Sequence, residues 1–398
     1  MSQPYSSFLS LLSESATIAM SRKSRELRKK GIDIINLSLG EPDFNTPDFI
    51  KKAAIEGINQ NYTHYMAVNG YEDLRDSIAR KFKRDNNLDY SSDKIVVSTG
   101  AKQTLSNIIL AIVDKDDEVI IPAPYWVTYF EQIKMVKGVP VPIITTIEKE
   151  YKISPEQLEK AITPKTKLFM FNSPSNPSGT IYSKEEIQQL ATVLKKYPNV
   201  FIISDEIYEH IVYDEDHYSI AQDSELFDRV ITVNGVSKAF AMTGWRVGYM
   251  GAAKWIADAC TKVQGQFTSG TNSIGQRAAK AAVEANPDVI KEMVNTFRER
   301  RDLIKGELDK IEGVKTNTPG GAFYIYPNIE AFFGKKYNDI AISNGSDLCE
   351  FLLEEAHVAT VPGEAFGTNK HIRMSYAASN EILIEAVTRI KKALSLLK

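Results

Sequence analysis

Short apolar runs of strand length alternate with amphipathic stretches of helix length through the middle of this sequence. Between two of these runs, Leu105, Ile108 and Ile112 repeat at the spacing of a single helix face. A further helix is expected after Ser183 and Glu186, which have the spacing of a capping box. Because strands separated by helices favour parallel pairing, the alternation predicts an α/β fold with a mostly parallel sheet sandwiched by helices. The strand candidates are residues 95–97, 119–121, 168–171, 200–204 and 230–233.

The pattern changes near Pro287, which opens a long amphipathic stretch that is followed by shorter strands and two more helices. Ser346 and Ser379 are the expected N-caps of those two helices. We therefore predict two domains with different architectures. The large domain is expected at residues 49–287. The smaller α+β domain is expected at residues 288–398, and the N-terminal segment at residues 1–48 is expected to form part of it.

Composition narrows the functional classes. The 398 residues are 43% apolar and 25% charged, close to a globular average. With 48 basic and 51 acidic residues the net charge is −3, so the chain lacks the basic excess of a nucleic-acid binder. Its apolar runs are short and interrupted, so no membrane span is expected. The two cysteines, Cys260 and Cys349, are too far apart in sequence for a disulfide framework or a CxxC metal site, which favours a cytoplasmic location and no bound metal.

Lys238 is the most informative single residue. It follows the predicted strand 230–233, is surrounded by small and apolar residues, and has Arg246 as its nearest cation in sequence. Apolar surroundings and a nearby cation both lower the pKa of an amine. A neutral amine is what a Schiff base with an aldehyde requires. The alternative is a lysine that extends from the sheet to solvent.

Asp205 and Tyr208 follow the strand candidate 200–204, at the carboxyl edge where open α/β sheets bind ligands. A carboxylate at this edge can keep a heterocyclic nitrogen protonated, and a tyrosine hydroxyl can donate to a phenolate-type oxygen. The alternative for the acidic residue is an ordinary helix N-cap.

Three further positions suggest anion or amide contacts. The turn Gly100-Ala101-Lys102 joins a strand to a helix start, where free N–H groups and the helix dipole attract phosphate. Asn176 lies in a proline-rich loop that would hold its amide rigidly. Arg373 lies on an alternating strand, and its guanidinium can bind a carboxylate with two hydrogen bonds. Each position has an ordinary alternative when it is taken singly. The turn could be an ordinary turn, Asn176 an ordinary loop residue and Arg373 part of a surface ion pair.

Together these positions match the needs of pyridoxal phosphate. That cofactor needs a lysine for its aldehyde, an acid for its ring nitrogen, donors for its ring oxygen, a phosphate cradle and an aromatic face. No GxGxxG or Walker A pattern points to a dinucleotide or a nucleoside triphosphate instead.

The whole chain resembles the class I pyridoxal-phosphate-dependent aminotransferases of fold type I. Within them it is most similar to the thermophile-like subgroup of bacterial aspartate aminotransferases. The long match from Val233 to Tyr249 is the most specific part. The other matching segments are residues 15–19, 40–44, 99–103, 124–127, 172–174 and 204–209.

The resemblance implies a role for each cofactor residue. Lys238 would form the Schiff base and move the substrate proton, Asp205 would keep the ring nitrogen charged, and Tyr208 would bond the ring oxygen together with Asn176. Trp126 would stack on the ring. The phosphate would be held by Gly100, Ala101, Lys102, Ser237 and Arg246, with Tyr65 reaching it from a neighbouring subunit.

The resemblance also implies the substrate contacts and the assembly. Arg373 would bind the substrate α-carboxylate, helped by Gly40, Trp126 and Asn176. Thr17 and Lys102 match the positions that this subgroup uses for a second carboxylate. A homodimer with shared active sites is implied, in which residues 264–271 also cross the interface. Ala67-Val68 replaces prolines that are common in relatives, so the loop that carries Tyr65 departs from the family pattern.

These roles lead to a main prediction with alternatives. The chain is expected to convert L-aspartate and 2-oxoglutarate to oxaloacetate and L-glutamate by ping-pong transamination. Prephenate, which also carries a second carboxylate, is an alternative substrate, as are kynurenine and alanine. A non-enzymatic pyridoxal-phosphate-binding regulator is disfavoured, because the lysine, the acid and two arginines of the site are all present.

Overall fold

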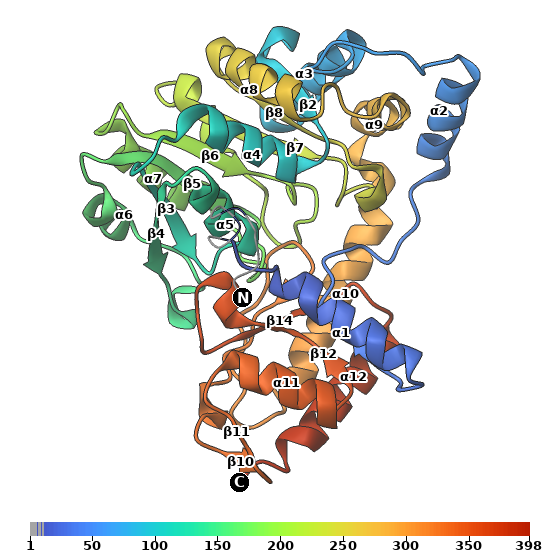
Figure 1. The fold of residues 1–398 in the computed structure, drawn as a ribbon, viewed down its shortest axis with the longest axis vertical. Helices are drawn as coiled ribbons and strands as arrows, with labels where there is room; N and C mark the ends of the chain where they lie inside the picture. Colours follow the sequence, from blue (N-terminus) through green and yellow to red (C-terminus); the bar gives the residue numbers. More distant parts are fainter. Residues whose placement is uncertain (1–5, 7–8, 10–11) are drawn as a thin grey trace.

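A seven-stranded sheet forms the centre of the computed structural model, which describes residues 6, 9 and 12–398 (Figure 1). Five neighbouring strands run parallel, whereas one strand near the edge runs antiparallel to both of its neighbours. The predicted α/β fold with a mostly parallel sheet is therefore confirmed. In spatial order the strands are β2 (Ile95–Ser98), the antiparallel β8 (Gly248–Gly251), β7 (Val230–Gly235), β6 (Phe201–Asp205), β5 (Thr166–Asn172), β3 (Glu118–Ala123) and β4 (Val139–Ile144).

Both faces of this sheet are buried. Along β5, Leu168 and Met170 join one hydrophobic cluster, while Phe169 and Phe171 join the cluster on the opposite face. This division follows from the period-two alternation of strand side chains. The first cluster is completed by α4 (Ala101–Ile112), α5 (Val127–Met135) and α8 (Lys254–Phe267), and the second by α3 (Glu72–Asn86), α7 (Lys184–Lys195) and α9 (Ser273–Glu284). The predicted stripe of α4 is buried as expected.

Shorter strands and four helices make up most of the C-terminal part and the N-terminal segment. A parallel pair of strands joins the N-terminal segment to the C-terminal part, because Ile35 pairs with Val358. The short strands are β1 (Ile35–Asn36) with β12 (Val358–Ala359), β10 (Lys336–Tyr337) with β11 (Ile340–Ala341), and β13 (Val361–Pro362) with β14 (Ile372–Ser375) and β9 (Tyr324–Ile325). The helices are α1 (Ala16–Lys29), α10 (Lys291–Leu308), α11 (Gly345–Glu355) and α12 (Asn380–Leu394); α2 (Asp48–Asn59) and α6 (Pro155–Ala161) accompany the large sheet. The domain boundaries at residues 48 and 287 stay predictions.

Side-chain caps fix where several helices begin. Ser183 and Glu186 form the predicted capping box of α7, and Ser379 caps α12 as expected. The prediction for α11 was wrong: its N-cap is Asn344, whose side chain accepts from the Asp347 N–H at 2.9 Å, and Ser346 lies inside the first turn. Asn and Ser are comparably good N-caps, and the helix begins directly after Asn344, two positions before Ser346.

Within the described ranges, no helix combines the length and the apolar character that crossing a membrane requires.

Candidate active site

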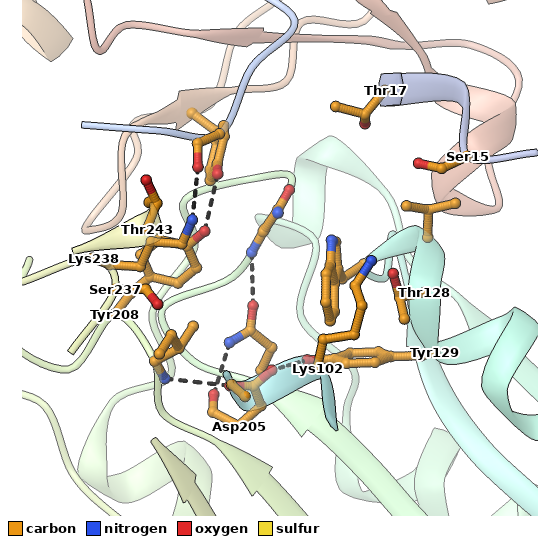
Figure 2. Close-up of a pocket in the computed structure, with 18 of the residues that line it drawn as sticks. Ser15, Thr17, Lys102, Thr128, Tyr129, Asp205, Tyr208, Ser237, Lys238 and Thr243 are labelled. Atoms are coloured by element: carbon orange, nitrogen blue, oxygen red, sulfur yellow. Dashed lines mark hydrogen bonds between the residues drawn. The ribbon is translucent and has the colours of Figure 1, made fainter. Parts of the chain in front are cut away.

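A cavity of about 250 Å³ lies at the carboxyl ends of β5 and β6 (Figure 2). The starts of α4 and α5, the segment after β7, the N-terminal segment, β9 and β14 supply the rest of its lining. Because parallel strands end at the same edge, side chains far apart in sequence meet there. The predicted residues that line it are Thr17, Gly40, Ala101, Lys102, Trp126, Asn176, Asp205, Tyr208, Ser237, Lys238, Arg246 and Arg373.

Lys238 follows β7 and reaches into the cavity, where its Nζ donates a hydrogen bond to the Gly40 carbonyl oxygen at 2.6 Å. Burial, and then the positive charge of Arg246, lower the pKa of this amine to about 8. A sizeable neutral fraction is therefore present near neutral pH, as the sequence surroundings predicted.

Asp205 ends β6 and is buried. Its Oδ2 accepts from the Tyr129 hydroxyl at 2.5 Å, and its Oδ1 accepts from the Ile207 N–H at 3.3 Å. Burial raises the pKa of Asp205 to about 6, and these two donors oppose that rise. The carboxyl group is therefore charged through most of the range above pH 6.

Tyr208 and Trp126 border the same space. The Tyr208 hydroxyl lies 2.9 Å from the Tyr324 hydroxyl, and burial holds the pKa of Tyr208 well above its ordinary value, so it stays a hydrogen-bond donor. Trp126 lies directly before α5 with its ring edge-on to Tyr129 at 5.6 Å.

The start of α4 forms an anion cradle. The Gln103 N–H already bonds the Gly100 carbonyl oxygen at 3.0 Å, whereas the N–H groups of Ala101 and Lys102 have no intrahelical acceptor, and Gly100, the N-cap, supplies no side chain to bond them. Gly100 has a φ of +82°, and a Cβ there would lie 2.9 Å from the Arg246 Cζ, so this position needs glycine. Ser237 and Arg246 line the cavity beside this helix start, and Arg246 donates to the Thr243 carbonyl oxygen at 2.8 Å.

Arg373 on β14 is only 2% exposed. Its two terminal nitrogens donate to Asn176 Oδ1 at 3.0 Å and to the Ser38 carbonyl oxygen at 2.5 Å. Its Nε has no hydrogen-bond partner within the described residues, and no carboxylate among them pairs with the guanidinium. Burial lowers its pKa from the ordinary arginine value. A buried guanidinium without a carboxylate partner is costly unless an anion joins it.

The outer end of the cavity is rich in hydroxyl groups. Ser15 and Thr17 from the start of α1 face Thr128 and Lys102 across it (Figure 2). The Lys102 Nζ lies 4.9 Å from the centre of the Trp126 ring. Burial, followed by the charge of Arg246, lowers the pKa of Lys102.

Two predicted residues do not line the cavity. Gly100 contributes through its backbone, directly before Ala101. Tyr65 lies in the loop after α2, is 98% exposed and is absent from the lining of the cavity of its own chain. Its predicted role at a neighbouring subunit stays a prediction.

Sequence reasoning missed several residues that the structure places at the site. Tyr129 bonds Asp205, Asn172 bonds the Asp205 carbonyl oxygen at 2.7 Å, and Tyr324 contacts both Tyr208 and the guanidinium of Arg373. The spacing of Trp126 and Tyr129, one helical turn apart, was a signal that could have found the first of these. No local signal marks Tyr324.

Comparisons with known proteins agree with this geometry. Residues 32–390 match the family of class I and II aminotransferases. The chain is 45% identical over 385 residues to an aspartate/prephenate aminotransferase of Nitrosomonas europaea, covering 96% of this chain and 97% of that one. It is 47% identical over 388 residues to a probable aspartate/prephenate aminotransferase of Rickettsia felis, covering 97% and 95%.

Solved structures give the same result. The aspartate aminotransferase of Rhizobium meliloti superposes with a TM-score of 0.96 at 42% identity, covering all of both chains. That of Thermus thermophilus, bound to maleate, superposes with a TM-score of 0.92 at 37% identity, covering 98% of this chain and 100% of that one. The family match spans far more than half of the chain, and the relatives extend over nearly all of it. The chain therefore belongs to the class I and II aminotransferase family and is an aminotransferase.

Proposed function

We propose that this aminotransferase uses pyridoxal 5′-phosphate to transfer the amino group of L-aspartate to 2-oxoglutarate by a ping-pong reaction, giving oxaloacetate and L-glutamate. The observation that carries the proposal is the charge of the cavity. Among the described residues that line it, Lys102, Lys238, Arg246 and Arg373 face the single carboxylate of Asp205. A phosphate and the carboxylates of a substrate would balance this excess of positive charge.

The donor set fits the cofactor. Lys238 would hold its aldehyde, Asp205 its ring nitrogen, and Tyr208 its ring oxygen together with Asn176. Trp126 would cover one face of the ring. The phosphate would rest on the first-turn N–H groups of α4, with Ser237 and Arg246 beside them. When bound, pyridoxal phosphate supplies an electron sink that stabilises a carbanion at the substrate α-carbon.

Lys238 is the group of this chain that moves the proton. With a pKa of about 8, its Nζ is neutral in part of the molecules at neutral pH and can take a proton from the substrate α-carbon and return one. The Gly40 carbonyl oxygen, which accepts from this amine at 2.6 Å, fixes its direction in the cavity.

Arg373 orients the substrate. Asn176 and Ser38 hold two of its nitrogens, so the guanidinium is fixed before a substrate arrives. The guanidinium lines the cavity and has no carboxylate partner among the described residues, so an α-carboxylate in the cavity would supply the missing anion. A preset donor loses little side-chain entropy on binding, which favours precise placement of the α-carbon beside Lys238.

The second carboxylate of aspartate would be received by Lys102 and Thr17 at the outer end of the cavity. Prephenate is the second candidate, because it also carries two carboxylates and because the relatives from Nitrosomonas and Rickettsia are named for both substrates. Kynurenine and alanine offer no second carboxylate to these residues and have weaker support.

The exposed loop that carries Tyr65 supports a homodimer with shared sites. The Gln264 side chain donates to the Val68 carbonyl oxygen at 2.6 Å, which joins this loop to the C-terminal turn of α8. Ile55 and Ile58 on α2 and Phe267 at the end of α8 are exposed, which favours burial against a second copy of the chain. The cytoplasmic location remains a prediction.

A panel of amino donors and acceptors tests the proposal. We expect the highest kcat/KM for aspartate with 2-oxoglutarate, with measurable activity for glutamate with prephenate and much lower values for kynurenine and alanine. Because specificity is a ratio of kcat/KM values, each donor is compared at the same acceptor concentration. A preference for alanine or kynurenine over aspartate would contradict the assignment.

Lys102→Ala is expected to lower kcat/KM for aspartate about 10- to 100-fold, as loss of a hydrogen bond to a charged group predicts. The value for alanine should change less than about threefold, because alanine has no distal carboxylate. Steady-state kinetics with both donors measures the difference. Lys134→Ala is the matched control, since Lys134 pairs with Glu131 at 3.3 Å and does not line the cavity. Equal losses with the two donors would refute the role of Lys102.

A further inference from the structure

Tyr129 is a buried residue in the lining of the cavity and is the one side chain that bonds the Asp205 carboxylate among the described residues. It is 1% exposed, and its hydroxyl donates to Asp205 Oδ2 at 2.5 Å. Burial first, and then the charge of Asp205, hold the pKa of Tyr129 well above its ordinary value. The hydroxyl therefore keeps its proton and acts as the donor.

The rest of Asp205 is fixed through backbone contacts. Its Oδ1 accepts from the Ile207 N–H at 3.3 Å, and its carbonyl oxygen accepts from Asn172 Nδ2 at 2.7 Å. These contacts hold Oδ1 and the backbone carbonyl of Asp205 but leave the other carboxylate oxygen, Oδ2, dependent on Tyr129. A charged carboxylate in a buried site is unfavourable unless donors compensate it.

Tyr129 also contacts the aromatic wall of the cavity. Its ring lies edge-on to Trp126, with the centroids 5.6 Å apart and the planes at 90°. Trp126 is the N-cap residue of α5 and Tyr129 lies in its first turn, so one short helix carries both side chains. The hydroxyl bonds the acid that would hold the cofactor nitrogen, and the ring contacts the indole that would cover the cofactor face.

We propose that Tyr129 is a positioning residue, whose hydroxyl holds Asp205 charged and oriented toward the ring nitrogen of pyridoxal phosphate while its ring sets Trp126 against the ring face. This inference rests on the proposed function. It assigns to Tyr129 a role that it performs through Asp205 and Trp126.

The expected signature is a pH-dependent cofactor affinity. The groups that face Asp205 are Tyr129 from α5, Lys238 after β7, and Glu206 and Tyr208 on its own segment. Asp205 titrates near pH 6, and loss of the tyrosine donor should raise its pKa. More of the variant would then be neutral at pH 6, whereas at pH 8.5 both forms would be charged.

The test compares the dissociation constant of pyridoxal 5′-phosphate for the unaltered protein and Tyr129→Phe, by absorption titration after removal of cofactor. We expect about a tenfold weaker affinity at pH 6 and less than about threefold at pH 8.5, on the scale of a hydrogen bond to a charged group. Tyr90→Phe is the matched control: Tyr90 is equally buried, its hydroxyl lies 3.0 Å from Thr232 Oγ1, and it does not line the cavity. Its affinity should be unchanged at both pH values.

Asp205→Asn, with and without Tyr129→Phe, separates positioning from packing. Without a charge at position 205, removal of the hydroxyl should change the affinity less than twofold, to within about 0.4 kcal/mol. If Tyr129→Phe alone fails to fold while the double variant folds, the hydroxyl serves the charge of Asp205 and the proposal stands; if both fail, Tyr129 is a packing residue and the proposal falls.

Equal losses at the two pH values, or no loss, would also overturn the role of Tyr129. If the unaltered protein bound no pyridoxal phosphate, the proposed function would fail as well. Binding by the unaltered protein with a pH-independent variant would remove only this inference.

Discussion

Lys238→Ala is expected to lower kcat for aspartate and 2-oxoglutarate at least about 10⁴-fold, the upper end of what a positioned acid–base group contributes. The loss follows because Lys102, the other lysine among the described residues that line the cavity, lies at its outer end, and because the Lys238 Nζ would be both the anchor for an aldehyde and the proton carrier. Steady-state turnover measures the loss. Borohydride reduction followed by peptide mapping should place the cofactor label on Lys238 alone in the unaltered protein.

Lys238→Arg is the control for charge. It keeps a cation beside the Gly40 carbonyl oxygen, but a guanidinium does not deprotonate at physiological pH, so the activity should fall as far as in the alanine variant. Thermal unfolding should show no loss of stability in Lys238→Ala, since burial already disfavours the charged amine. A label on another lysine, or activity within tenfold of the unaltered protein, would contradict the assignment.

Lys81→Met is expected to lower the free energy of unfolding by about 3–5 kcal/mol, the cost of leaving a buried charge without its partner. Lys81 is 2% exposed, contacts Glu209 Oε1 and donates to Asn86 Oδ1 at 2.8 Å. Burial would raise the pKa of Glu209, but the charge of Lys81 and nearby histidines reverse this and hold it at about 2. Glu209 is therefore charged at neutral pH and depends on Lys81.

The pH dependence of this effect has a defined sign. In the unaltered protein the depressed pKa of Glu209 stabilises the fold above its unfolded pKa, and this contribution is lost only as the pH falls toward 2. In Lys81→Met, burial raises the pKa of Glu209, so protonation relieves the unpaired charge as the pH falls. The difference between the two proteins should be larger at pH 7.5 than at pH 5.

Urea midpoints at these two pH values provide the measurement. Lys83→Met is the matched control on the same helix, because Lys83 pairs with Asp89 at 2.8 Å with both side chains exposed, and such pairs contribute at most about 1 kcal/mol. Adding Glu209→Gln to Lys81→Met should recover part of the loss. A loss below about 1 kcal/mol in Lys81→Met would contradict the account.

Much of the fold was predictable because local pattern and tertiary burial agree in it. The stripe of α4 and the capping box of α7 were both readable from spacing alone. Strand β4 was not, because Pro140 and Pro142 interrupt it, and proline lacks the N–H that a central strand needs. The structure resolves this by placing β4 at the edge of the sheet. The antiparallel direction of β8 was likewise invisible, since direction leaves no periodic signal.

The residues of the site also separate into those that the sequence predicted and those that it did not. Residues whose chemical type is unusual in its surroundings, such as Lys238 and Arg373, were found from sequence. Tyr129 and Tyr324 were missed because their importance comes from partners that lie 76 and 116 residues away, Asp205 and Tyr208. In the sequence, a tyrosine within an apolar helix or strand resembles an ordinary core residue, because the hydrogen-bond partner of its hydroxyl cannot be identified there.

One side of the outer end of the cavity and the floor of the cavity come from separate parts of the chain. Ser15 and Thr17 belong to the start of α1, whereas Asp205 ends one strand of the central sheet and Lys238 follows another. Mutations in the first part can therefore change which side chain a substrate presents without moving the groups that do the chemistry. Substrate specificity can therefore change through substitutions in the N-terminal segment alone. This segment is the place to randomise in directed evolution.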